Sequence, residues 1–280
     1  MARFRLELLG SFRAHGQDGS PVRFPTRKTE ALLAFLALPP RRSRSRDELA
    51  HLLWGDSSDS LARKSLRQTL FLLRRMAIHG GGPRLIEEAA SVRLDSADVD
   101  VDADDFEGCV REGTRASLAR AGSLYRDDLL MGISVSTPAF EEWLMHERAR
   151  YRERAIEAIA TTLRDHCATG SRDEAIQSAL RLLTIDSLQE SVYRTLMRLY
   201  VESGRRALAL RSYEACAALL RRELGVEPEE ETRALYRQIV RRTVPTAPAR
   251  PPGARAGGPG QPAALPADTN SGIARTVAPL

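Results

Sequence analysis

The chain has 280 residues with 42 basic and 37 acidic side chains, a net charge of +5, and it is long enough for two domains with separate cores. No apolar run approaches the roughly 18 residues of a membrane span, the first residues lack the apolar segment of a signal peptide, and the three cysteines form no paired spacing. These properties exclude a membrane-spanning protein and a disulfide framework, and we expect a soluble, cytoplasmic protein.

Basic residues are concentrated at the start of the chain. Residues 1–80 contain 15 Lys and Arg against 7 Asp and Glu, a net charge of +8. Such an excess indicates either a polyanionic partner or a solvated basic surface, and charge alone does not separate the two.

The first residues have the pattern of a small sheet. Phe4, Leu6 and Leu8 alternate with polar residues, as on one face of a half-buried strand. Residues 16–19 have the composition of a turn, and residues 22–24 are predicted to form the returning strand.

Two helices with clear boundaries are predicted next. The first begins near Arg27, and the Pro39-Pro40 pair must end it because proline cannot continue a helix. Ser45 and Glu48 have the spacing of a capping box, in which each side chain binds a free amide of the first turn. The short helix that they begin ends at Gly55.

A third, longer helix is predicted from about Ser60 to Ile78, and residues 84–88 and 91–94 can pair as a hairpin. Strands, three helices and a hairpin in this order predict a winged helix-turn-helix with a leading sheet. The acidic run at 98–105 lacks the glycine and glutamate positions of a calcium loop. We therefore interpret it as a strand and connector, and we expect no metal site.

From there to about residue 243 the chain has helical periodicity. A long helix is predicted from Thr137 to Cys167. Gly170 and Gly204 are 34 residues apart, and an alanine follows each of them five residues later. This period, with small residues where helices cross, is typical of tetratricopeptide-like helix pairs.

The sequence thus predicts a mixed, mainly α protein of three parts. Residues 1–106 form a winged helix-turn-helix domain with a small antiparallel sheet, and residues 107–243 form an all-α tetratricopeptide-like domain. Residues 244–280 hold 8 of the 15 prolines and have no apolar periodicity, which predicts a disordered tail.

Short segments with a characteristic order are spread along the chain. They are Phe4-Arg-Leu-Glu-Leu-Leu-Gly10, Lys28-Thr-Glu-Ala-Leu-Leu-Ala34, Leu53-Trp-Gly55, Ser65-Leu-Arg-Gln68, Leu73-Arg-Arg75, Trp143 with Glu147-Arg148, and Glu223-Leu-Gly-Val-Glu-Pro228. In order and spacing they resemble the SARP family of bacterial transcriptional activators over about residues 3–242. That family joins an OmpR-type winged helix, a domain of the two-component output type, to a bacterial transcriptional activator domain.

The resemblance implies a sequence-specific, DNA-binding transcription regulator that recruits RNA polymerase and binds double-stranded DNA as a homodimer. Two alternatives remain open. One is a helical protein-interaction scaffold, and the other is the regulatory N-terminal region of a larger signalling protein. Phosphate-loop, dinucleotide, zinc-protease and esterase motifs are all absent, so we expect no enzyme, no catalytic residue and no cofactor.

The third helix carries the candidate DNA-binding residues. At 100° per residue, Leu66, Leu70, Leu73 and Ala77 share the core face, and the opposite face holds Lys64, Gln68, Phe71 and Arg75. In a helix-turn-helix this helix enters the major groove. We expect Lys64 and Gln68 to read bases; the expected backbone and wing contacts are Arg63, Arg67, Arg74, Arg75 and, in the hairpin, Arg93.

Phe71 is apolar on this outward face and has two interpretations. It can touch a thymine methyl, or it can pack on another subunit or on the helical domain.

The loop before the third helix is acidic. Residues 55–60 include Asp56 and Asp59 and no basic residue, so the loop gains nothing from DNA phosphate. By resemblance to OmpR-type activators, Asp56 and Asp59 are expected to contact RNA polymerase. The alternative is that Asp59 only caps the third helix.

Overall fold

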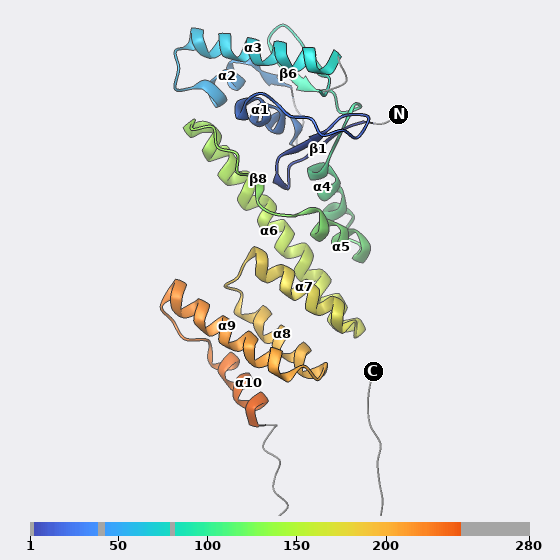
Figure 1. Cartoon of the computed structure of the whole chain (residues 1–280), viewed down its shortest axis with the longest axis vertical. Helices are drawn as coiled ribbons and strands as arrows, with labels where there is room; N and C mark the ends of the chain where they lie inside the picture. Colours follow the sequence, from blue (N-terminus) through green and yellow to red (C-terminus); the bar gives the residue numbers. More distant parts are fainter. Residues whose placement is uncertain (1–2, 39–42, 79–81, 242–280) are drawn as a thin grey trace, which may run out of the picture. The chain divides into compact units, whose positions relative to one another are not determined.

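The leading sheet is built around the predicted first strand. The computed structural model describes residues 3–38, 43–78 and 82–241, and Figure 1 shows the order of its elements. β1 (Phe4–Glu7) pairs antiparallel with β3 (Arg13–His15) and parallel with β7 (Val99–Val101). The sheet is therefore mixed. Its parallel strand, β7, follows the three helices in the sequence and is not joined to β1 by a hairpin.

The returning strand predicted at 22–24 is wrong. The strand that returns beside β1 is β3, which precedes the turn at residues 16–19. After that turn, an isolated bridge joins Pro21 to His15. Val22 donates one hydrogen bond to the Ala14 carbonyl (2.8 Å). Pro21 and Pro25 flank this segment and have no amide hydrogen, so it cannot continue a ladder.

The three predicted helices of the N-terminal region are confirmed. α1 is Arg27–Ala37, α2 is Arg46–Trp54 and α3 is Asp59–Ile78. The Oγ of Ser45 accepts a hydrogen bond from the Glu48 amide (3.0 Å), as half of a capping box requires.

The predicted hairpin is also confirmed, and it forms the wing. β5 (Leu85–Glu87) pairs antiparallel with β6 (Ser91–Leu94), and β4 (Arg44–Ser45) adds a strand on the other side of β6. This sheet has the order β4-β6-β5, so the residues just before α2 are held beside the wing.

The helical region begins earlier than the acidic connector suggested. Only β7 is a strand, and α4 (Asp102–Glu112) follows it at once. Acidic side chains in its first turn suit the positive end of the helix dipole. α5 (Arg115–Leu124), β8 (Leu129–Met131) and the long α6 (Pro138–Thr169) come next, the last within two residues of its predicted bounds.

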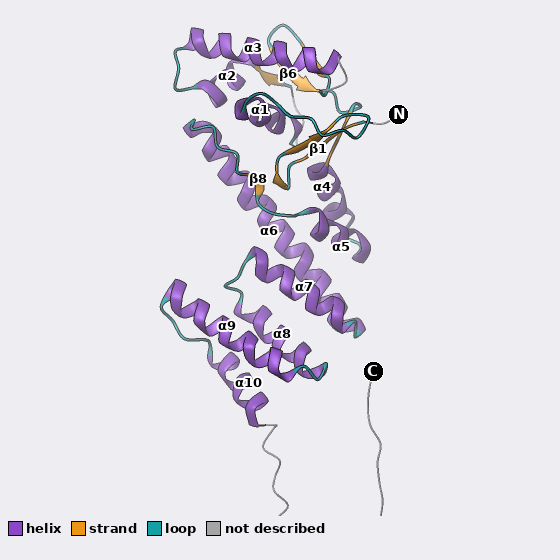
Figure 2. Ribbon diagram, viewed as in Figure 1, coloured by secondary structure: helices purple, strands orange, loops and turns teal. Residues whose placement is uncertain are grey.

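Helix pairs make up the rest of the described chain, as Figure 2 shows. They are α7 (Arg172–Ile185), α8 (Glu190–Glu202), α9 (Arg206–Leu224) and α10 (Glu230–Arg241). Gly170 and Gly204 end their helices with φ of 74° and 71°, a conformation that favours glycine. Ala175 and Ala209 are fully buried, so the predicted repeat matches real helix crossings.

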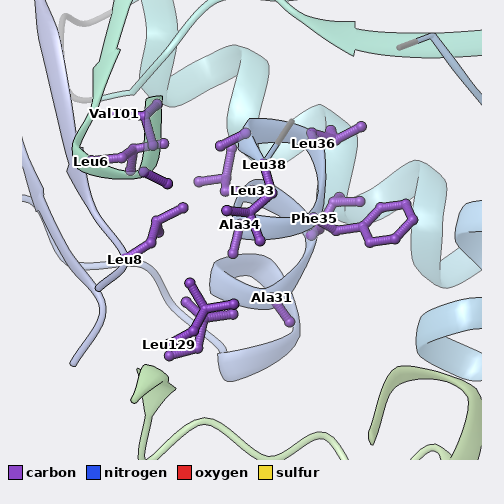
Figure 3. Packing of buried hydrophobic residues seen from close by; sticks show 14 of the residues in the cluster. Leu6, Leu8, Ala31, Leu33, Ala34, Phe35, Leu36, Leu38, Val101 and Leu129 are labelled. Carbon is purple, nitrogen blue, oxygen red and sulfur yellow. The ribbon is translucent and has the colours of Figure 1, made fainter. Parts of the chain in front are cut away.

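One apolar core serves the sheet, the three N-terminal helices and the first part of the helical region. Figure 3 shows Leu6, Leu8 and Val101 on one side of α1, with Leu129 of β8 beside the same helix. This cluster extends to Ala158, and a second cluster begins at Ile159 in the same helix. The domain boundary at residue 106 stays a prediction, and residues 244–280 lie outside the described residues.

A short parallel pair ties the helical region to the leading sheet. β2 (Gly10–Ser11) pairs with β8, and the Leu130 amide donates to the Leu8 carbonyl (2.9 Å). Nearby, the Thr137 hydroxyl donates to the carbonyl of Leu53 at the end of α2 (3.2 Å). Because β8 and Thr137 belong to the helical region, the sequence-distant segments fold as one unit.

Asp102 is the buried polar centre of this junction. Its carboxylate accepts hydrogen bonds from the amides of Leu8 (2.8 Å) and Leu9 (3.1 Å) and pairs with the Arg126 guanidinium at 2.8 Å. Its side chain is 1% exposed. Burial raises the pKa of Asp102 above its ordinary value, against the opposing effect of the two amides and Arg126.

Candidate nucleic-acid interface

α3 presents the two faces that its sequence predicts. Leu66, Leu70 and Leu73 of the predicted core stripe are buried, whereas Ala77, near the end of the helix, is only half-buried. The opposite face is exposed along its length, and it holds Lys64, Gln68, Phe71 and Arg75 with Arg67 beside them. In Figure 1 the helix lies along the edge of the N-terminal region, with α2 next to it. Nothing in the described chain therefore covers this face.

Thr69 is a residue of α3 that the sequence wheel did not place. It is buried, and its hydroxyl donates to the Ser65 carbonyl one turn earlier (3.0 Å). Satisfying the hydroxyl within the helix lets a polar residue join the core face.

Two of the predicted DNA-binding arginines already have carboxylate partners. Arg63 pairs with Asp47 of α2 at 2.9 Å, and both side chains are more than half exposed. Arg74 makes two hydrogen bonds to Glu87 of the wing, one of them 2.7 Å from Nη2 to Oε2. Arg46 at the start of α2 binds the same Glu87 carboxylate at 2.6 Å.

Glu87 thus joins the wing to both helices of the helix-turn-helix. Its side chain is 14% exposed. Burial alone would raise the pKa of Glu87, but the hydrogen bonds from Arg74 and Arg46 outweigh it and hold the pKa below the ordinary value. The roles of Glu87 and Arg46 could not be predicted from the sequence, because the hairpin holds two glutamates, Glu87 and Glu88, and nothing in the local pattern distinguishes them.

The other predicted DNA-binding cations of α3 have no carboxylate partner in the described part of the chain. Over residues 3–38, 43–78 and 82–241, no salt bridge joins Lys64, Arg67 or Arg75 to a carboxylate. Arg93 lies in β6 opposite Ile86, on the face away from the buried Val92, and is half-buried. α3 therefore exposes positive charge, and Arg93 is a partly exposed cation of the wing.

The loop before α3 holds the two acidic candidates. Asp56 and Asp59 are both exposed. The Ser58 carbonyl accepts the first helical hydrogen bond, from the Ala62 amide (2.9 Å), which makes Ser58 the cap and puts Asp59 in the first turn. A cleft of about 240 Å³ separates this loop from α2, and Trp54 and Asp59 line it.

The helical region also packs against α1. Trp143 of α6 packs edge-on against Phe35 of α1, with ring centroids 4.9 Å apart. Trp143 belongs to one of the ordered segments noted in the sequence, but its partner on α1 could not be known from its spacing.

Two further properties concern the described residues alone. No group of three or more His, Cys, Asp or Glu side chains there is placed to hold a metal ion. Among the same residues, no helix combines the length and the apolar character that crossing a membrane requires.

Comparison with known proteins identifies the family. The sequence profile of the bacterial transcriptional activator domain matches residues 97–240. The chain is 28% identical over 235 residues to the transcriptional regulatory protein MoaR1 of Mycobacterium tuberculosis, covering 80% of this chain and 75% of that one. It is 28% identical over 251 residues to the regulatory protein AfsR of Streptomyces griseus, covering 85% of this chain but only 24% of AfsR.

A solved structure has the same fold. Mycobacterium tuberculosis EmbR, in complex with a low-affinity phosphopeptide, superposes with a TM-score of 0.60 at 24% identity. The superposition covers 86% of this chain and 65% of EmbR. The sequence of the Mycobacterium bovis transcriptional regulatory protein EmbR is 29% identical over 241 residues, 80% of this chain and 60% of that one. The chain belongs to the bacterial transcriptional activator domain family and is a transcription regulator of the SARP type.

Proposed function

We propose that the chain binds duplex DNA by placing α3 in the major groove and activates transcription by recruiting RNA polymerase. The observation that supports this best is the outward face of α3, where Lys64, Arg67 and Arg75 are exposed and unpaired among the described residues. A second helix of a helix-turn-helix with such a face suits a polyanionic groove.

The proposal gives the residues of α3 different roles. Lys64 donates to guanine and Gln68 makes paired hydrogen bonds to adenine, because both lie on the outward face in the N-terminal half of α3, which reaches the base edges. Arg67 and Arg75 contact phosphates and set the register. Arg93 reaches the minor groove from the wing.

The two ion-paired arginines, Arg63 and Arg74, differ in the strength of their ion pairs. An exposed pair such as Arg63 with Asp47 is worth about 0–1 kcal/mol, so Arg63 can exchange Asp47 for a phosphate. Arg74 is held by two hydrogen bonds to a largely buried carboxylate. We therefore assign Arg74 mainly to fixing the wing, with a phosphate contact as a secondary role.

Substitutions on α3 should separate base reading from backbone binding. Gln68→Ala is expected to relax preference at one base position and to cost about 1–3 kcal/mol on the best site. Arg75→Ala is expected to weaken all duplexes alike and to flatten the salt slope by about one unit. Mobility shifts at several salt concentrations measure both, and Arg211→Ala, an exposed arginine of α9, is the matched control.

Two results would contradict the proposal. Unchanged affinity and preference in both Gln68→Ala and Lys64→Ala would remove base reading from these residues. If the wild-type chain shows no salt-dependent binding to any duplex, the DNA-binding proposal fails and a helical protein-interaction scaffold becomes the better account.

The contact with polymerase is assigned to the loop before α3. Asp56→Arg is expected to leave operator affinity intact or slightly raised, because positive charge is added near DNA, while transcription in a purified system falls. Glu214→Arg, an exposed reversal in α9, is the matched control. If transcription and DNA binding fall together, the loop is only a structural link between α2 and α3.

The proposal includes a homodimer on DNA, with the helical region fixing two winged helices on a repeated site. The stoichiometry of the complex on a two-site duplex, against a one-site duplex of the same length, tests this part separately. A single chain bound at saturation to the two-site duplex would contradict it.

A further inference from the structure

Phe71 lies on the outward face of α3. Its side chain is 57% exposed. Gln68 lies one turn before it and Arg75 one turn after it, and Lys64 lies two turns before it, all exposed. Phe71 is part of neither apolar cluster and of no ring contact in the described chain.

The fold does not need an aromatic ring at this position. Other residues of α3 form its contribution to the core: Ala62, Leu66, Leu70 and Leu73 are buried there, and Met76 packs against the same cluster. An exposed phenylalanine leaves apolar surface in water that a partner can bury.

The surrounding charges favour nucleic acid over protein. An apolar protein surface placed on Phe71 would also desolvate Lys64, Arg67 and Arg75, which have no carboxylate partners among the described residues. Removing water from unpaired charges is unfavourable. A DNA groove supplies phosphates to those cations and, at thymine, an apolar group at the base edge.

We infer that Phe71 reads the 5-methyl group of a thymine in the major groove. The inference rests on the proposed function, in which α3 is the recognition helix. Phe71 lies three residues beyond Gln68, about 4.5 Å along the helix axis, which is close to one base step of about 3.4 Å. The thymine is therefore expected one step from the base that Gln68 reads.

Removing the methyl group from the DNA tests the contact directly. A duplex is selected by the full chain from a random-sequence pool, and each of its thymines is replaced singly by uracil, which keeps the hydrogen-bonding edge and loses only the methyl. Wild-type affinity is expected to fall about fourfold at one thymine, the equivalent of about 0.8 kcal/mol for one buried carbon group. Replacement at the other thymines leaves the affinity unchanged.

The protein side of the cycle uses two alanine variants. Phe71→Ala is expected to bind the thymine duplex more weakly and to lose all sensitivity to uracil at that one position. Leu224→Ala removes an equally exposed apolar side chain, 57% exposed, at the end of α9, and it keeps the wild-type sensitivity.

The outcomes separate the inference from the function on which it rests. A wild-type chain that binds DNA but is insensitive to uracil at every thymine overturns the inference and leaves DNA binding intact. The same holds if Phe71→Ala keeps the sensitivity, or if it lowers only the number of chains bound per duplex, which identifies a protein contact. Absence of salt-dependent DNA binding by the wild type removes both.

Discussion

Asp102→Ala is expected to lower the free energy of unfolding by about 3 kcal/mol, because two buried amides lose their acceptor at about 1–3 kcal/mol each. Those amides belong to Leu8 and Leu9, whose side chains are fully buried. A loss of this size is a large part of the 5–15 kcal/mol of a typical domain. Urea unfolding followed by the fluorescence of Trp54 and Trp143 measures it.

A second acidic residue of α4 provides the control. Asp105 is more than half exposed and faces Arg120 at 3.6 Å, so Asp105→Ala is expected to cost less than about 1 kcal/mol. Asp102→Asn keeps one acceptor and should fall between the two. If Asp102→Ala is no less stable than Asp105→Ala, the carboxylate does not hold the junction together.

A fragment that ends at residue 106 is expected to lack a cooperative unfolding transition. It retains β1, α1 and the wing but loses β8, which pairs with β2. It also loses Trp143 on Phe35 and the contacts that Tyr125 and Tyr151 make with Phe106. Leu8, Leu9 and Phe35, buried in the whole chain, would face water at about 25 cal/mol per Å² of apolar surface.

A longer fragment tests whether the first part of the helical region restores cooperative unfolding. Residues 1–170 keep the whole of α6 and its Gly170 cap, so they retain every buried residue of the first apolar cluster, which ends at Ala158. This fragment is expected to unfold cooperatively, as judged by circular dichroism in urea. If the 1–106 fragment matches its midpoint, the winged helix is an independent domain with the boundary that the sequence predicts.

Local signals explain what the sequence predicted correctly. α3 begins within one residue of its predicted start, and the Ser45 cap and the wing hairpin lie where they were expected. Each of these depends on residues within a few positions of one another, through apolar periodicity or a side-chain bond to a nearby amide. The exposed face of α3 follows from the same periodicity, so the sequence predicts correctly that Lys64 and Gln68 are exposed.

The partners of the charged groups could not be named in advance. Glu87 binds Arg74 across 13 residues and Arg46 across 41, and Asp102 binds amides 93 and 94 residues away. A carboxylate has the same local pattern whether it is solvated or buried, so periodicity does not distinguish the two. This is why the wheel assigned Arg63 and Arg74 the same role as Arg67.

By itself the sequence determined the helices, the wing, the helical repeat and, through the order of its segments, the family, because these depend on short-range spacing. Only the tertiary structure decided that β7 and β8 complete the N-terminal sheets and that a single core crosses residue 106. It alone also decided which arginines of α3 have a carboxylate partner among the described residues. Those features depend on contacts between residues that are far apart in the sequence, which form only when the chain closes long loops. The local sequence pattern does not contain the energy of these long-range contacts.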